Sequence, residues 1–307
     1  MRAAPFSDAL VALGRERPDV VVLSADLSNY TDLIGFTTAF PERFIQVGMA
    51  EQNMMGIAGG LARSGFLPIA VTYGVFATRR AFDQVAMAMC TGPVKAIVVA
   101  FLPGITTPFR ATHQATDDLA LMREIPGMTV IDPADATELA AALSAAAAHP
   151  GTVYLRGLRG MVEERFDPAG FEFVIGQART LRRGADVAIV STGLGTAWAL
   201  DAVDELATRG IEASLLHVPT LKPIDSGAIA ELAGRFGVLH VIENHSVIGG
   251  LATAVAEVVA QVGVATTVRP LGVPDEWAPA GSLDHIRSEL GLSTGALADR
   301  IMPAVGR

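Results

Sequence analysis

A glutamate at the start of an expected helix is the first residue that could do chemistry. Residues 44–47 form a short apolar run that predicts a strand, and residues 50–63 show a helical pattern that begins just after Gly48. Glu51 therefore lies in the first helical turn, where the helix dipole favours a carboxylate. On the pattern alone, the favoured interpretation is a surface glutamate on an ordinary helix packed against its sheet.

The same predicted helix has an unusual number of small residues: Gly56, Ala58, Gly59 and Gly60. A glycine inside a helix costs about 1 kcal/mol relative to alanine. A helix that tolerates such a cluster is expected to have something packed very closely against it.

Flat side chains occupy the next strand-to-helix junction. Tyr73, Phe76 and Arg79 have the spacing i, i+3, i+6, which puts them on one side of the chain. There they could sandwich an aromatic ring, although core packing uses the same spacing. Further along, the polar loop of residues 111–114 places His113 ahead of another predicted helix.

Several other kinds of site are absent from the sequence. No Gly-x-x-x-x-Gly-Lys-Ser/Thr string occurs, so no P-loop is expected. The Gly193/Gly195 pair begins like a dinucleotide fingerprint, but Trp198 stands where a small residue is needed, which favours a plain strand-to-helix turn. No set of His, Cys or acidic residues has metal-ligand spacing, and we expect no metal site within this chain.

Composition limits the class of protein. The 307 residues include 23 basic and 32 acidic side chains, a net charge of −9 that argues against a nucleic-acid surface. Cys90 is the only cysteine, which excludes a disulfide framework within the chain. The N-terminal stretch lacks a signal-peptide core, and no window approaches the roughly 18 apolar residues of a membrane span. The expected location is the cytoplasm.

Short β-branched runs alternate with helical patterns along most of the chain. Strands are expected at residues 20–23, 44–47, 68–72, 94–101, 129–131, 153–155, 187–191, 213–218, 238–243 and 266–270. Helices are expected at residues 50–63, 77–90, 117–124, 135–149, 196–208, 226–236, 250–261, 282–290 and 294–301. This alternation predicts an α/β protein with two doubly wound domains. We place the first at residues 1–160, a charged linker at 161–183 and a smaller second domain at 184–307.

The ordered set of motifs resembles one family, the thiamine-diphosphate-dependent transketolases, over nearly the whole chain. The string Gly48-Met49-Ala50-Glu51-Gln52-Asn53-Met54-Met55 is specific, and the ordered set is more so. The other matching segments are Ser24-Ala25-Asp26-Leu27, Tyr73 with Phe76, Thr112-His113-Gln114, Pro126-Gly127-Met128, Asp132-Pro133-Ala134-Asp135, Gly184-Ala185-Asp186, Thr220-Leu221-Lys222-Pro223 and Glu243-Asn244-His245.

The resemblance implies a set of cofactor contacts. Glu51 would hydrogen-bond the aminopyrimidine ring of thiamine diphosphate and favour the imino tautomer, whose nitrogen removes the thiazolium C2 proton. Tyr73 and Phe76 would form the aromatic wall around that ring. Arg79 matches a position that is aromatic in some relatives and arginine in others, and Asp26 matches an aspartate near the cofactor.

The resemblance also implies substrate contacts. His113 would act at the catalytic centre and hold the sugar's hydroxyls or phosphate. Arg156 would clamp the sugar phosphate, since a bidentate guanidinium suits that anion. Arg2 and Ser28 match two further phosphate contacts.

One loop departs from the family pattern. Relatives carry Gly-Glu-Asp-Gly just before Thr-His-Gln, whereas this chain has Thr107-Pro108-Phe109-Arg110 in a loop one residue shorter. The usual aspartate contacts a sugar hydroxyl, so its loss argues against standard pentose phosphates. Phe109 and Arg110 suggest a donor or acceptor that is less hydroxylated or more anionic.

A second departure concerns the rest of the enzyme. The family binds Mg²⁺ and the diphosphate through a Gly-Asp-Gly…Asn motif, and this chain contains no Gly-Asp-Gly. The resemblance therefore implies one subunit of a split transketolase, which transfers two-carbon ketol units between sugars. A partner chain would supply the metal and diphosphate site, with α2β2 as the expected assembly.

Two alternatives stay open. One is the β subunit of a 2-oxo-acid dehydrogenase E1 component, or an enzyme like 1-deoxyxylulose-5-phosphate synthase. The other is a non-catalytic α/β binding protein, against which the retention of Glu51, Phe76, His113 and Arg156 weighs.

Overall fold

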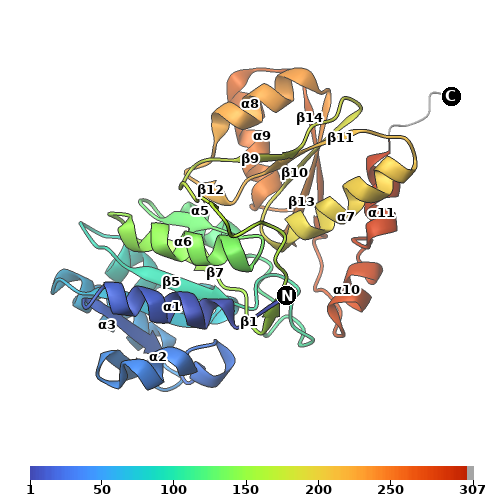
Figure 1. Ribbon diagram of the computed structural model, residues 1–307. Helices are drawn as coiled ribbons and strands as arrows, with labels where there is room; N and C mark the ends of the chain where they lie inside the picture. The colour runs from blue at the N-terminus through green and yellow to red at the C-terminus, as the bar shows by residue number, and fades with distance from the viewer. Residues whose placement is uncertain (303–307) are drawn as a thin grey trace.

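The computed structural model describes residues 1–302, so residues 303–307 of the predicted second domain lie outside it. Two sheets, each with helices on both faces, confirm the predicted pair of α/β domains (Figure 1). Within residues 1–302, no helix is long and apolar enough to cross a membrane.

The first sheet has seven strands, and all of its pairings are parallel except the one at the β12 edge. Its continuous apolar strands suit a sheet that is buried on both faces. In order across the sheet the strands are β12 (Thr220–Lys222), β6 (Thr129–Ile131), β7 (Val153–Arg156), β5 (Ile97–Phe101), β4 (Leu67–Tyr73), β2 (Val20–Ser24) and β3 (Phe44–Gln46).

Helices cover the two faces of this sheet. On one face α1 (Pro5–Glu16) and α6 (Ala136–Ala148) lie side by side, with α2 (Ile34–Ala39) against α1 (Figure 1). On the other face lie α3 (Glu51–Arg63) and α5 (Asp118–Glu124). Side-chain alternation separates the two cores, because Ile69 and Val71 of β4 join one apolar cluster and Ala70 joins the other. The short turns of this domain are η1 (Ser28–Tyr30) and η2 (Pro41–Arg43).

The sequence predicted one helix near residues 77–90, and the structure is helical over most of this range but not as one regular α-helix. The structure has a π-helical turn, η3 (Phe76–Arg80), then α4 (Phe82–Gln84) and a second π-helical turn, η4 (Val85–Met89). A π-turn shifts the residues that follow it around the helix axis, so a 3.6-residue periodicity does not predict which side chains share a face.

The second sheet has five strands, all parallel except the edge strand β9. The order is β14 (Thr267–Val273), β13 (Val238–Ser246), β10 (Val187–Ser191), β11 (Ala213–His217) and β9 (Arg179–Arg182). One apolar cluster holds α7 (Leu194–Thr208), α10 (Leu283–Glu289) and α11 (Thr294–Ile301); another holds α8 (Ser226–Arg235) and α9 (Leu251–Val262). Strand β9 lies inside the predicted linker, as does β8 (Met161–Val162), which pairs with β1 (Arg2–Ala3).

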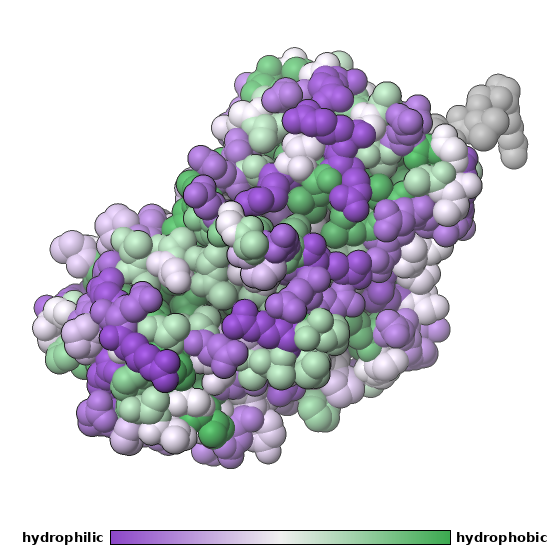
Figure 2. Space-filling view, in the orientation of Figure 1, coloured by the Kyte–Doolittle hydropathy of each residue, from purple (hydrophilic) through white to green (hydrophobic). Residues whose placement is uncertain are grey.

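The two domains share a buried junction. Strand β12 follows β11 in the chain, yet it pairs with β6 and completes the first sheet. His217 at the end of β11 lies 2.8 Å from a Glu138 oxygen of α6, and both side chains are buried. On the outer surface, hydrophilic side chains gather where the domains meet (Figure 2). The domains are therefore joined by polar as well as apolar contacts.

Candidate active site

Loops at one edge of the first sheet bring the candidate residues together. Strands β2, β3, β4, β5 and β7 run parallel, so their carboxyl ends meet at the same edge, where ligands bind in open α/β sheets. After β3, Gly48 turns the chain with φ +72°. Helix α3 begins three residues later, at Glu51, which places this carboxylate at that edge.

Glu51 is a buried acid with one cationic partner. Its side chain is 1% exposed although it begins a helix, and no side chain caps α3. Arg80 Nη1 donates to Glu51 Oε1 at 2.9 Å and to Oε2 at 2.8 Å. The Arg80 side chain is 47% exposed, so the pair joins the buried carboxylate to the surface.

An aromatic cluster lies beside this pair. The His113 ring centroid is 6.0 Å from that of Tyr73 and 5.5 Å from that of Phe76, and the last two are 5.8 Å apart. Phe109 adds a further ring, 5.1 Å from His113. Arg80 links the cluster to Glu51, because its guanidinium carbon lies 4.1 Å from the Phe76 centroid. The structure thus brings Glu51, Tyr73, Phe76 and His113 into one region.

Arg79 and Arg80 point to different partners. Arg79 Nε donates to Asp117 Oδ2 at 2.8 Å, and the guanidinium lies 5.4 Å from the Trp277 ring centroid. From the i, i+3, i+6 spacing, the sequence predicted that Arg79 would lie on the same side of the chain as Phe76. The π-helical turn η3 instead brings Arg80 over Phe76, and the sequence interpretation missed Arg80.

Arg156 does not reach this region as a free cation. It is fully buried, and its guanidinium donates to Asp118 Oδ2 at 2.9 Å and to Asp132 Oδ2 at 3.1 Å. Tyr154 also donates to Asp118, at 2.7 Å. Burial raises the pKa of Asp132 to about 6, whereas Arg156 outweighs burial at Asp118 and lowers that pKa. The expected phosphate clamp is, in this structure, the centre of a buried ion-pair network.

Arg159, three residues further on, is exposed near the aromatic cluster. Its guanidinium lies 5.9 Å from the Tyr73 ring centroid, and Nη1 donates to the Tyr30 carbonyl at 3.1 Å. Residues 1–302 contain no carboxylate within ion-pair distance of it. Arg159 could have been noticed in the sequence because it lies just past the end of a predicted strand. The sequence interpretation instead named Arg156 as the phosphate clamp.

The remaining predicted residues lie at the rim. Asp26 is exposed just past β2 with φ +62°, and its backbone N–H donates to Gln46 Oε1 at 2.7 Å. Ser28 begins η1, Arg110 is exposed beside Phe109, and Arg2 lies in β1 with Asp8 at 3.5 Å. Of these four, only Arg110 touches the aromatic cluster, and it does so through its backbone, since the His113 N–H donates to the Arg110 carbonyl at 2.9 Å. No side-chain hydrogen bond in the described chain joins any of the four to Glu51.

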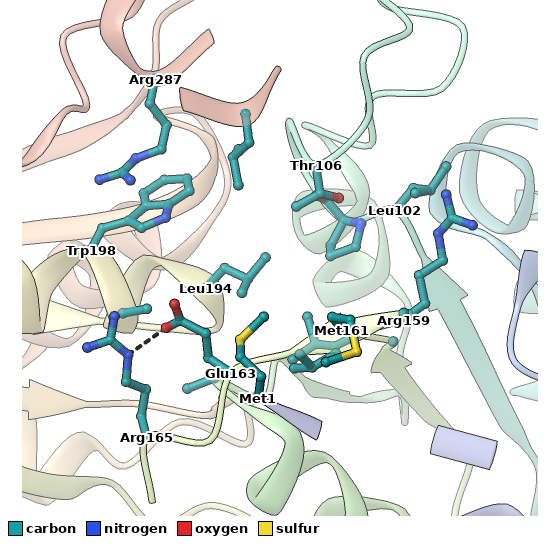
Figure 3. A pocket seen from close by; sticks show the side chains of 18 of the residues that line it. Met1, Leu102, Thr106, Arg159, Met161, Glu163, Arg165, Leu194, Trp198 and Arg287 are labelled. Carbon is teal, nitrogen blue, oxygen red and sulfur yellow. Dashed lines mark hydrogen bonds and ion pairs between the residues drawn. The ribbon is translucent and has the colours of Figure 1, made fainter. Parts of the chain in front are cut away.

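A crevice of about 630 Å³ extends from Arg159 toward the second domain. Figure 3 shows Arg159 and Leu102 on one side and Trp198 with Arg287 on the other. Leu102 has φ +57°, a left-handed conformation that leucine rarely adopts, at the carboxyl end of β5. Such strain is typical of functional loops.

The donor set fits one half of thiamine diphosphate. A buried carboxylate beside a cluster of tilted and edge-to-face aromatic rings suits the aminopyrimidine, which offers a flat face and hydrogen-bonding nitrogens. Residues 1–302 hold no group of three or more His, Cys, Asp or Glu side chains able to bind a metal. Glu51 with Tyr73 and Phe76 could thus hold the ring, and no ligand set here suits the metal that accompanies the diphosphate.

Comparison with known proteins gives two family matches. Residues 2–164 match the transketolase pyrimidine-binding domain, and residues 176–297 match the transketolase C-terminal domain.

Individual relatives match along most of the chain. A transketolase family protein of Sinorhizobium fredii is 46% identical over 98% of this chain and 88% of its own length. A 6-deoxy-6-sulfo-D-fructose transketolase subunit of a Clostridium strain is 39% identical over 94% of this chain and 89% of its own length. The 1-deoxy-D-xylulose-5-phosphate synthase 1 of Geobacter sulfurreducens is 35% identical, and the match spans only 46% of that enzyme.

Solved structures agree with these relatives. A split-gene transketolase, described as an inactive β4 tetramer, superposes with a TM-score of 0.86 and 40% identity over 97% of this chain and 95% of its own. The family matches, the relatives and this structure lead to one conclusion. The chain belongs to the transketolase family and carries its pyrimidine-binding and C-terminal domains.

Proposed function

We propose that this chain is the cofactor-activating subunit of a split, thiamine-diphosphate-dependent transketolase. The observation that carries the proposal is the buried Glu51 carboxylate at the start of α3, beside Tyr73, Phe76 and His113. When bound, thiamine diphosphate supplies the electron sink for cleaving and transferring a two-carbon ketol unit.

Each residue of the site has a role in this proposal. Glu51 holds a proton at the aminopyrimidine ring, and its burial keeps water from competing for that hydrogen bond. Phe76 and Tyr73 offer aromatic faces that fix the ring plane. His113, whose ring meets both aromatic rings edge to face, would donate a hydrogen bond to a substrate oxygen.

A second polypeptide completes the site in this proposal. It would carry Gly-Asp-Gly…Asn, bind Mg²⁺ and the diphosphate, and form an α2β2 assembly. Three observations support a missing partner: residues 1–302 hold no metal-ligand group, a similar split-gene subunit alone is an inactive β4 tetramer, and α3 exposes Gly56 and Gly60 with open space around them.

The proposed substrates are anionic ketoses and aldoses. Arg159 has no carboxylate partner in the described chain and is the candidate contact for the anionic end of the substrate. Arg110, which is close to His113 in the sequence, is a second exposed cation. A relative that is 39% identical acts on 6-deoxy-6-sulfo-D-fructose, a sulfonated ketose. Residues 107–110 stand where relatives have an acidic loop, and within them the Phe109 ring is 60% exposed. An apolar ring at this place favours a donor substrate with fewer hydroxyl groups.

The test is turnover of the complex that this chain forms with its co-purified partner. Glu51→Gln should leave assembly intact and lower ketol transfer by about 10²–10⁴-fold, the usual range for a positioned acid–base group. Donors should include fructose 6-phosphate, 6-deoxy-6-sulfofructose and pyruvate, since use of pyruvate alone would favour the synthase-like alternative. Wild-type rates from Glu51→Gln would refute the role of Glu51.

A further inference from the structure

Arg80 makes both of the contacts that the proposed function assigns to the cofactor ring. One nitrogen of its guanidinium bonds both Glu51 oxygens, at 2.9 and 2.8 Å. The same guanidinium lies over Phe76, with its central carbon 4.1 Å from the ring centroid. No other residue of the described chain contacts both Glu51 and the Phe76 ring in this way.

The guanidinium and an aminopyrimidine are chemically alike in the features that matter here. Both are planar, both stack on an aromatic face, and both present N–H donors in their plane to a carboxylate. Two planar groups cannot occupy the same face of Phe76 and the same oxygens of Glu51. An aminopyrimidine ring at this place therefore requires the Arg80 side chain to leave.

We propose that Arg80 is a gating residue for the cofactor: its guanidinium stands in for the aminopyrimidine ring against Glu51 and Phe76, and it swings out before the ring enters. This inference rests on the proposed function. It also explains how a carboxylate with 1% exposure is tolerated at the site, because a buried charge needs a compensating partner.

The surroundings allow Arg80 to move. Its side chain is 47% exposed, and Glu51 is its one ion-pair partner within residues 1–302. Its backbone is held separately, since Gln52 Nε2 donates to the Arg80 carbonyl at 3.1 Å. Arg79 contrasts with it, because its guanidinium is fixed by Asp117 and by the Ala111 carbonyl at 2.7 Å. Of the two neighbouring arginines, Arg80 is the one that can exchange partners.

The experiment measures thiamine diphosphate binding to the complex of this chain with its partner, in Mg²⁺, by calorimetry and by stopped-flow spectroscopy. Arg80→Ala removes the partly exposed Arg80–Glu51 pair that competes with the cofactor ring. This variant should therefore bind thiamine diphosphate about twofold to fivefold more tightly than wild type. The gain should appear as faster association, because a closed state no longer has to open. Arg80→Lys should stay close to wild type, since one ammonium can bond both oxygens as Nη1 does.

Two controls separate gating from general effects. Arg209→Ala removes an ion-paired arginine on the far domain, where it contacts Glu205 and Asp299, and should not change cofactor affinity. In the Glu51→Gln background, Arg80→Ala should no longer speed association, because the charged pair is already gone. If Arg80→Ala does not fold, Arg80→Gln, which drops the charge, should show the same faster association.

The outcomes are distinct. Weaker or unchanged binding by Arg80→Ala would overturn the gating role and make Arg80 a cofactor contact or a bystander. A wild-type complex that binds no thiamine diphosphate would instead overturn the proposed function, and the gating role with it. Faster association in Arg80→Ala, absent in the Glu51→Gln background, is the result that supports gating.

Discussion

Arg156 and Arg159, three residues apart, lie in opposite environments. Arg156 is buried between Asp118 and Asp132, whereas Arg159 is exposed beside Tyr73 and lines the interdomain crevice. A guanidinium binds a phosphate or sulfonate well only if its N–H groups are free to do so. We therefore propose Arg159, rather than Arg156, as the contact for the anionic end of the proposed substrate.

Arg159→Met should raise KM for an anionic substrate by about tenfold or more, because a charge-assisted contact contributes about 1.5–3 kcal/mol. The thermal unfolding midpoint should change little, since Arg159 is exposed and has no ion pair in the described chain. Steady-state kinetics of the complex provide the measurement. An unchanged KM would remove Arg159 from the substrate site.

Arg156→Met is the matched comparison. Loss of the Arg156 guanidinium leaves Asp118 and Asp132 buried without their shared cation. The free energy of unfolding should therefore fall by about 3–5 kcal/mol. Chemical denaturation of the isolated chain measures this. A stable Arg156→Met protein with a raised KM would restore the original phosphate-clamp interpretation.

At this scale the sequence drew attention to some residues and not to others. Glu51 and His113 were proposed because each stands in a short motif, Glu51 just past a strand end and His113 in a polar loop ahead of a helix. Arg80 and Arg159 were missed because side-chain direction depends on local backbone geometry. A π-helical turn put Arg80 rather than Arg79 over Phe76, and the three residues between Arg156 and Arg159 carry the chain out of the core.

At the scale of single elements, the small residues of α3 divide by face. A Cβ on Gly59 would clash with the Ala88 carbonyl oxygen of η4, so close packing within the chain explains this glycine. A Cβ on Gly56 or Gly60 would meet nothing within 4 Å. The expected close packing on α3 is therefore internal at Gly59, and the other two glycines are open to a partner.

Alanine substitutions on α3 should have opposite effects. Gly59→Ala forces η4 away from α3 and should lower the free energy of unfolding by about 1–3 kcal/mol. Gly60→Ala has room and should raise it by about 0.5–1 kcal/mol through lower chain entropy. Denaturation of the isolated chain tests both variants, and equal effects would contradict the packing described here.

Element prediction succeeded where the pattern was continuous. Helix α3 and strands β6 and β10 have the expected bounds to within a residue, because apolar periodicity and turn residues agreed there. It did not predict the π-turns within residues 77–90, which break the α-helical periodicity, or strand β12, which is too short and too polar to predict a strand. Strand β12 forms only because β6 offers it an edge across the domain junction.

At the scale of the whole molecule, the junction holds buried acids whose charge opposes folding. Glu243 of β13 accepts from the backbone N–H groups of Leu251 at 2.6 Å and Ala252 at 2.9 Å, at the start of α9. Burial raises its pKa from 4.5 to about 7. Between these two values the folded chain binds more protons than the unfolded chain, so stability should fall as pH rises through this window.

Glu243→Gln should therefore remove a downward slope in stability between about pH 4.5 and 7. His240 and His245 act in the opposite direction, because burial lowers each pKa to about 4 and stability rises with pH as they lose protons in the unfolded chain. The difference between variant and wild type reports Glu243 together with its coupling to His245, whose Nδ1 lies 3.8 Å from Glu243 Oε2. Denaturation at several pH values gives that difference, and parallel curves would contradict the raised pKa.

The central claim is that this chain holds the aminopyrimidine half of the cofactor site and needs a partner for the rest. The most direct measurement is calorimetric titration of thiamine diphosphate and Mg²⁺ into the chain alone and into its complex with the co-purified partner. We expect saturable binding to the complex and none to the chain alone. Equal binding to both would contradict the claim, because the chain would then hold the diphosphate and metal without help.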